Sequence, residues 1–412
     1  MKHWMTIAWA LTFLPLAWAD PKLDNLYEEL LYNDFKETIL TSESTHLKKN
    51  GFTAFEQSVF VDVLWDLVEE QNPVALKALD SVNTFHYDLI ERLRLGILRI
   101  KYQRAAVLPE ELIQELNNIL LNPVVETKLI YILAAYETEL LSAGHTDIIE
   151  LAKNHAQYFD ISEDEVRKKE ITNDIVADLF HHAPDVTTYM NGEYVKSVKI
   201  FMFCRENRLY PCLMVMRNVH GEVVRNEDGT LWTNPSLGSS ARGLPSYTRN
   251  GNTPQGVWTI DSVMPYADQT MSFGKFRRMM INFIPKSKNE VLLKTLLPES
   301  SHDQEWWKPT VVARDIGRSL FRIHGTGKIN KDPTTPYYPF MRTSGCIAQR
   351  ENTYGDVTFK DQRELLDDIM SAMDLEPIFE NEVKVKGLLY LIEIDDVNEP
   401  VTAEDLALRG IE

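Results

Sequence analysis

The feature that most constrains the fold is a change of hydrophobic periodicity near residue 185. Before it, apolar residues recur at helical spacing, as in Phe55, Val59, Val63 and Leu67, which would share one helix face. After it, short apolar runs are separated by turn residues, which is typical of strands. The chain of 412 residues is also longer than most single domains. The sequence therefore predicts a helical first domain and a β-rich second domain.

The change of pattern sets the expected boundaries. We predict a helical accessory domain over residues 20–184, a β-rich domain over 185–396 and a peripheral acidic tail over 397–412. Apolar spacing predicts helices around residues 55–67, 112–120 and 129–140 of the first domain. In the second domain, strands are expected at 257–260, 279–284 and 388–394, and a helix at 362–373.

The N-terminus has the pattern of a secretory signal. Lys2 precedes an apolar run over residues 6–18, and the small-residue pattern Ala17-Trp18-Ala19 follows. We predict a cleavable signal peptide over residues 1–19 and an exported, periplasmic protein; an uncleaved anchor is the alternative. The run is too short for a relaxed transmembrane helix, so we expect no membrane span.

The net charge and the spacing of histidines argue against nucleic acid and metal ions as ligands. The formal net charge is −18, which argues against nucleic acid, because a phosphate-binding surface needs clustered Lys and Arg. His181 and His182 are adjacent and have no apparent third ligand, so we expect no metal site, and we expect no cofactor.

Three cysteines remain to be explained. Cys204 and Cys212 flank a predicted hairpin tip, where they would be either a disulfide or two buried thiols. Cys346 follows Gly345, and His324 stands upstream beside Gly325. A thiol becomes a strong nucleophile when a nearby base takes its proton, and a His that comes close in the fold can do so. The pattern predicts cysteine-dependent acyl transfer.

Three segments in order sharpen this hypothesis. The segment Thr253-Pro254-Gln255-Gly256-Val257-Trp258, then Ile323-His324-Gly325-Thr326, then Thr343-Ser344-Gly345-Cys346 together resemble the catalytic domain of YkuD-type L,D-transpeptidases over about residues 185–396. The strand pattern fits a β-rich sandwich or barrel-like domain, and the resemblance implies a YkuD-like sandwich that acts on peptidoglycan stem peptides. It implies Cys346 as nucleophile and His324 as general base and acid, with the Gly325 carbonyl orienting the imidazole. It also implies an oxyanion hole formed by backbone N–H groups of Gly345 and Cys346.

The segment around the nucleophile departs from the family pattern. Ser344 occupies a position that is often His or Lys, and Ala348 stands where many members have Arg, with Arg350 two residues later. The interval from His324 to Cys346 also looks longer than usual. We expect substrate contacts from Arg342, Ser344, Arg350 and Tyr338. Residues 328–343 would form either a flap over an anionic stem peptide or a solvated loop.

Several activities share this chemistry. Transfer to an amine would be L,D-transpeptidation, transfer to water would be L,D-carboxypeptidase trimming, and a third outcome cleaves a wall-anchored lipoprotein. A non-catalytic wall-binding protein with a degenerate fold is a further alternative. Because all three segments follow residue 185, we expect the second domain to hold the chemistry alone. The helical domain has no predicted role beyond possible binding of a protein partner.

Overall fold

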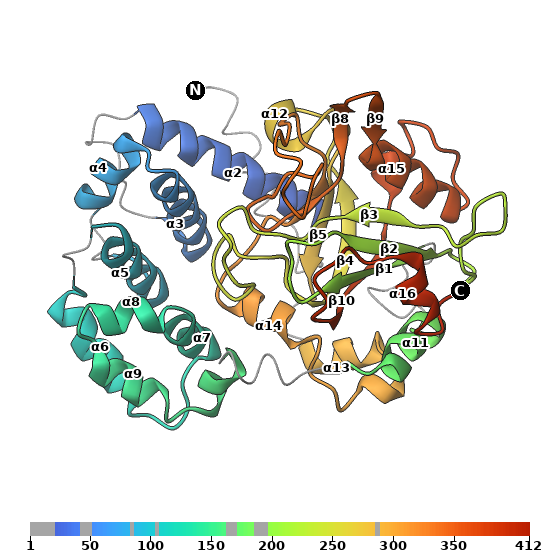
Figure 1. The fold of residues 1–412 in the computed structure, drawn as a ribbon. Helices are drawn as coiled ribbons and strands as arrows, with labels where there is room; N and C mark the ends of the chain where they lie inside the picture. The colour runs from blue at the N-terminus through green and yellow to red at the C-terminus, as the bar shows by residue number, and fades with distance from the viewer. Residues whose placement is uncertain are drawn as a thin grey trace, which may run out of the picture.

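The computed structural model describes residues 21–41, 52–82, 86–103, 107–161, 171–184, 197–284 and 289–412. The predicted signal peptide lies outside these ranges. A group of helices stands on one side of the molecule and a mixed β-sheet on the other (Figure 1). The two parts predicted from the change in periodicity are therefore present.

The first part is entirely helical in its described residues. Its elements are α2 (Pro21–Thr41), α3 (Ala54–Glu69), α4 (Pro73–Ser81), α5 (Leu89–Gln103), α6 (Glu110–Leu120), α7 (Thr127–Ala135), α8 (Glu137–Ser142), α9 (Thr146–Ala152) and the 3-10 turn η2 (Ala156–Ile161).

Local sequence explains where these helices begin and end. The Thr53 hydroxyl accepts a hydrogen bond from the Glu56 N–H, and the Glu56 carboxylate accepts one from the Thr53 N–H, so a capping box starts α3. The helix expected over 129–140 is divided into α7 and α8 at Tyr136, whose φ of −120° is not helical. Apolar spacing alone does not register such a break.

The second part is built on one eight-stranded sheet in the order β3-β2-β1-β10-β4-β5-β6-β7. Its neighbours are antiparallel except for the pairs β1–β10 and β6–β7. The strands are β1 (Val198–Arg205), β2 (Cys212–Arg217), β3 (Asn234–Ser236), β4 (Gly256–Val263), β5 (Met279–Phe283), β6 (Arg322–His324), β7 (Ile347–Ala348) and β10 (Gly387–Asp395). A separate hairpin joins β8 (Glu351–Tyr354) and β9 (Val357–Lys360).

The central strands are buried on both faces. Phe201 and Phe203 of β1 pack into one apolar cluster, whereas Ile200 and Met202 pack into another on the opposite face. This alternation follows from the two-residue period of a strand. A disulfide joins Cys204 to Cys212, with a Cα–Cα distance of 4.4 Å, and links β1 to β2.

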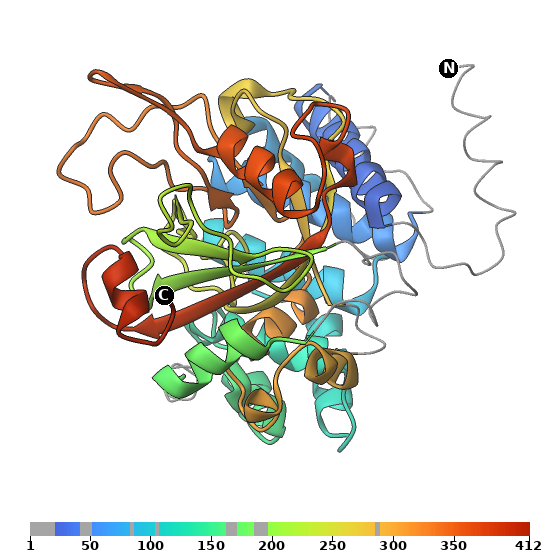
Figure 2. The same ribbon diagram turned by 90° about the vertical axis from the view of Figure 1, so that its right-hand side faces the viewer.

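Helices cover both faces of this sheet. The helix α11 (Asn173–His182) lies against one face and α15 (Asp361–Ala372) against the other (Figure 2). The remaining elements here are α12 (Thr270–Phe273), α13 (Asn289–Thr295), η6 (Glu299–Ser301), α14 (Lys308–Asp315), η7 (Glu382–Lys384) and α16 (Ala403–Ala407). The result is one nearly barrel-shaped mixed sheet with helical layers, which agrees with the barrel-like of the two expected β-rich architectures.

Two further expectations need correction. We placed residues up to 184 in the helical domain, but Val176, Leu179 and Phe180 of α11 are buried in the sheet's apolar cluster. We expected residues 397–412 to be peripheral, but Leu406 and Ile411 are buried in the same cluster. Val401, Leu406 and Ile411 fix the tail to the sheet, whereas Val397 and Leu408 are exposed.

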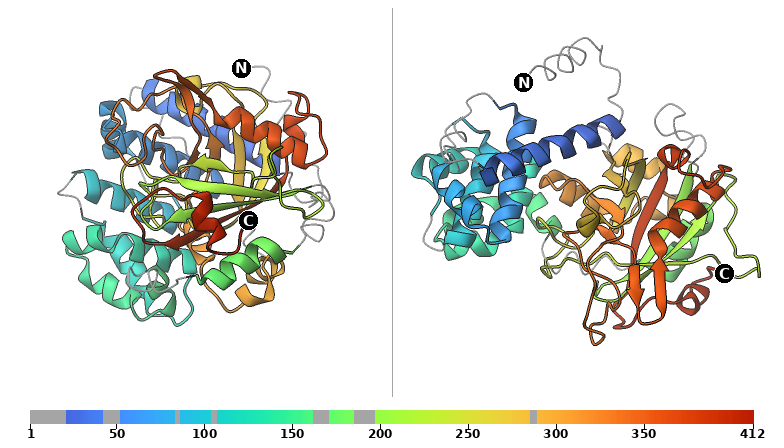
Figure 3. Two further views of the ribbon diagram at one scale, coloured as in Figure 1. Left: turned by 45° about the vertical axis from the view of Figure 1, so that its right-hand side comes forward. Right: turned by 90° about the horizontal axis from the view of Figure 1, so that it is seen from above.

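Two helices tie the parts together. The helix α2 runs along the helical group and reaches the sheet side (Figure 3), where Glu29 forms ion pairs with Arg278 and Arg322. In the opposite direction, Val312 and Ile316, in and just after α14, are buried in the core of the helical group. Within the described ranges, no helix is long and apolar enough to cross a membrane.

Candidate active site

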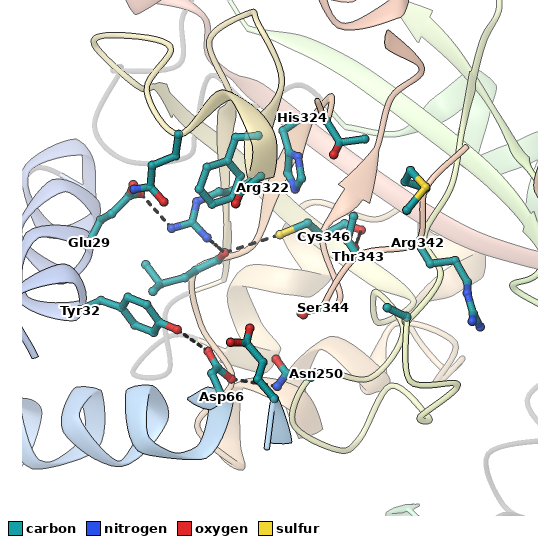
Figure 4. Close-up of a pocket in the computed structure, with 18 of the residues that line it drawn as sticks. Glu29, Tyr32, Asp66, Asn250, Arg322, His324, Arg342, Thr343, Ser344 and Cys346 are labelled. Atoms are coloured by element: carbon teal, nitrogen blue, oxygen red, sulfur yellow. Dashed lines mark hydrogen bonds and ion pairs between the residues drawn. The ribbon is translucent and has the colours of Figure 1, made fainter. Parts of the chain in front are cut away.

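A cavity of about 560 Å³ lies where the two parts meet. Residues of α2 and α3 form one wall, and loops of the sheet part form the other (Figure 4). Both Cys346 and His324 line this cavity. The sequence predicted these two side chains to meet, and the structure brings them into one pocket.

The strand register explains why they face the same space. Ile323 of β6 pairs with Ile347 of the parallel strand β7, and both side chains are buried in the apolar cluster below. Because side chains alternate along a strand, the residues on either side of Ile323 and Ile347 face the opposite way. Arg322, His324 and Cys346 therefore project into the pocket, with Arg322 level with Cys346.

The imidazole of His324 is buried and oriented. Its Nδ1 lies 2.5 Å from the Gly325 carbonyl oxygen, so Nδ1 carries the proton that it donates, and Nε2 is left as the basic nitrogen. Burial lowers the pKa of His324 to about 4, and the charges of Arg322 and Arg278 act in the same direction. The predicted contact with Gly325 is present, and the ring is neutral at pH 7.

The thiol of Cys346 is also uncharged at rest. Burial raises its pKa, and Arg322 opposes that effect through its charge and through hydrogen bonds from its side chain and backbone. The Sγ atom lies 3.9 Å from the Leu320 carbonyl oxygen. The sequence led us to expect that His324 takes the proton of Cys346, but the two pKa shifts favour a neutral thiol and a neutral imidazole.

The turn before the nucleophile is tightly packed. Gly345 has φ +107°, and a Cβ there would lie 2.4 Å from the Arg318 guanidinium and 2.6 Å from the Gly251 carbonyl oxygen. Only glycine meets both conditions. Buried Arg318 donates hydrogen bonds to the carbonyls of Gly251 and Asn252, at 2.8 and 2.9 Å. The guanidinium thus joins the loop over 246–252 to the nucleophile turn.

The turn revises the predicted oxyanion hole. The Gly345 N–H donates to the Thr343 hydroxyl at 3.2 Å, and that hydroxyl donates to the Cys346 carbonyl at 2.6 Å. The Gly345 donor is therefore engaged inside the turn, which corrects its assignment as an oxyanion donor. The Cys346 N–H is left as the donor of the predicted pair.

The segment containing Thr253 and Pro254 supports this turn from below. The Thr253 hydroxyl donates to the Gly345 carbonyl at 2.9 Å. Trp258, on β4, donates from its indole N–H to the Pro254 carbonyl at 3.2 Å and is fully buried. Trp258 is thus a core residue, and Thr253 ties this segment to the turn that precedes Cys346.

The four predicted substrate residues fall into two groups. Arg342 and Ser344 line the pocket. Arg350 instead forms an ion pair with Asp361 at 2.5 Å and lies 4.2 Å from the Phe359 ring. Tyr338 packs edge-on against Tyr354 with 5.4 Å between ring centroids. Arg350 and Tyr338 are not among the residues that line this pocket, so the structure does not bring them together with Cys346.

The wall of the pocket contributed by the helical part was not predicted from sequence. Glu29 and Tyr32 of α2 and Asp66 of α3 line the same pocket as Cys346. Asp66 accepts hydrogen bonds from Tyr32 at 2.6 Å and from Asn250 at 2.8 Å. The expectation that the second domain holds the whole site is therefore corrected. In the sequence, Glu29, Tyr32 and Asp66 are polar residues on amphipathic helices, and such residues cannot be told apart from ordinary solvent-facing ones.

The fold and the site together define a protein in which a half-buried Cys and a buried His line a pocket shared by a helical region and a mixed sheet. Comparison with known proteins adds no relative, since no family model, no curated protein and no solved structure matches the chain.

Proposed function

We propose that this protein is a cysteine acyltransferase acting on peptidoglycan stem peptides, an L,D-transpeptidase of the YkuD type. The observation that carries the proposal is the placement of Cys346 and His324 in one pocket, with the His324 Nδ1 fixed on the Gly325 carbonyl. Nucleophile, base and orienting group are the three parts that thiol-dependent acyl transfer needs.

The reaction would run through a thioester. As Sγ attacks the stem-peptide carbonyl, the thiol proton passes to His324 Nε2, and the S–C bond forms. The C–N bond to the terminal D-alanine then breaks, and the imidazolium gives its proton to the departing amine. Because both groups are neutral at rest, charge develops only in the transition state, where Arg322 and the Cys346 N–H stabilise it.

Two further observations support the proposal. Lys36, Lys328 and Arg342 line the pocket of a chain that is strongly acidic overall, so the site offers positive charge to the carboxylates of a stem peptide. The disulfide between Cys204 and Cys212 suits an oxidising compartment, in keeping with export to the periplasm.

The direct test uses the full mature chain with a synthetic tetrapeptide stem and a D-amino acid acceptor. We expect a product in which the acceptor replaces the terminal D-alanine, and a carbapenem adduct on Cys346 by intact mass. Cys346→Ser should lose both, and Asp160→Asn, remote from the pocket, should keep both. A tripeptide product would assign the protein as an L,D-carboxypeptidase. Folded wild-type protein that gives neither adduct nor product would contradict catalysis and favour a wall-binding role.

A further inference from the structure

Charged residues connect the helical region to the surroundings of Cys346, and the sequence did not predict this contact. Glu29 on α2 accepts a hydrogen bond from the Arg322 guanidinium at 2.8 Å and forms an ion pair with Arg278. The second terminal nitrogen of Arg322 donates to the Leu320 carbonyl at 2.6 Å. That carbonyl is also the group within 3.9 Å of the Cys346 sulfur. One buried guanidinium thus connects α2 to the nucleophile (Figure 4).

The register fixes Arg322 beside the thiol. It is level with Cys346 across β6 and β7, and its side chain is more than nine-tenths buried. A positive charge in such a place favours the thiolate strongly, because water screens it little. Glu29 is equally buried and offsets part of that charge. The acidity of the nucleophile therefore depends on a carboxylate from a different part of the fold.

Other charged groups near the thiol also affect the pKa of Cys346. Lys36, Arg242, Arg249, Lys328 and Arg342 line the pocket as cations, and Glu70 and Asp66 as anions, beside neutral His324. Arg278, Arg318 and Glu28 lie outside the lining, and burial raises the pKa of Glu28. Asp66 is paired with Arg249, and Arg318 is bonded to backbone carbonyls. Arg322 is the group whose charge and hydrogen bonds both act on Cys346, and Glu29 is its acidic partner.

We propose that Arg322 is a positioning residue for the Cys346 thiolate and that Glu29 holds Arg322 in place and limits its effect on the thiol. The helical region is then part of the nucleophile machinery. The proposal rests on Cys346 being the reactive group, as in the proposed function, but it does not require any particular acyl substrate.

The test measures the acidity of Cys346 directly. The other two cysteines are joined in a disulfide, so iodoacetamide labels one site, and its rate against pH gives the thiol titration. Glu29→Gln keeps an acceptor for Arg322 but removes the negative charge, so labelling near pH 7 should be about threefold to tenfold faster. Arg322→Gln should be slower by a similar factor, and Arg322→Lys should recover most of the loss because it keeps the charge.

The matched control is Asp160→Asn. Asp160 also pairs across the two parts, with Lys308 of α14 at 2.5 Å, but it does not line the pocket. Thermal unfolding of each variant separates lost fold from changed acidity. The proposal is overturned if labelling of Glu29→Gln is unchanged or slower relative to Asp160→Asn, or if Arg322→Gln and Arg322→Lys label alike.

The outcome is separable from that of the proposed function. A shifted thiol titration with no stem-peptide product would keep this inference and reject the acyl-transfer substrate. Normal product formation with an unshifted titration in all variants would do the reverse.

Discussion

The burial of His324 makes a quantitative prediction about stability. Its pKa is about 4 in the folded protein against an ordinary value of 6.5, with burial as the main cause. As pH falls from about 6.5 to about 4, the unfolded chain takes up a proton that the folded protein does not. The free energy of unfolding therefore falls as pH is lowered through this interval, and His324 causes no such loss above about pH 6.5. At about 1.4 kcal/mol per pKa unit, this group alone removes about 3 kcal/mol.

The perturbation is His324→Gln, whose amide can still donate to the Gly325 carbonyl but does not titrate. The assay is urea unfolding followed by tryptophan fluorescence, for both proteins, at about pH 7 and about pH 4. Carboxylates and the other histidines titrate in both proteins, so their contributions cancel in the difference. We expect the stability of wild type relative to His324→Gln to drop by about 3 kcal/mol between the two pH values.

Equal pH dependence of the two proteins would contradict a lowered pKa of His324. If wild type and His324→Gln lose stability in parallel, His324 titrates normally and is not held in a dry, neutral site. The proposal that acyl transfer starts from a neutral thiol and a neutral imidazole would then also fail, because it depends on the lowered pKa of His324.

Three further predictions test other parts of the site. Gly345→Ala should unfold at lower temperature, by an amount worth more than about 1 kcal/mol, and lose carbapenem acylation, because φ +107° and the contacts to Arg318 and Gly251 exclude a Cβ; an adduct at the wild-type rate would show that the turn adapts. A chain beginning at residue 171 should be poorly soluble and unreactive, because it exposes Val312 and Ile316 and leaves Arg322 without Glu29; rapid acylation of such a chain would show that the helical region is dispensable. Arg342→Ala should raise KM for a tetrapeptide stem severalfold, because Arg342 lines the pocket. Arg350→Ala should lower Tm and leave KM near wild type, because Arg350 does not line the pocket and pairs with Asp361. Equal effects of the two variants on KM would contradict these different roles.

The sequence by itself determined the local features of this protein. The four-residue apolar spacing located α3, and the apolar run over 388–394 located β10 within one residue at each end. It also indicated that Cys346 and His324 could lie together, because a thiol and an imidazole beside glycines suit acyl-transfer chemistry, and both line one pocket. These signals are local: they depend on periodicity, turn geometry and residue chemistry, all of which are written within short stretches of chain.

The tertiary structure alone decided which distant residues share the pocket. Nothing near Glu29 in the sequence indicates that it pairs with Arg322, nearly three hundred residues later. Nothing near Arg350 indicates that it forms an ion pair with Asp361. Charged side chains look alike in sequence whether they bind substrate, pair with each other or face water. Their roles depend on burial and on partners brought by other elements, and these same two quantities set the low pKa of His324. That is why local sequence pointed to Cys346 and His324, whereas the wall of the pocket around them could not be predicted.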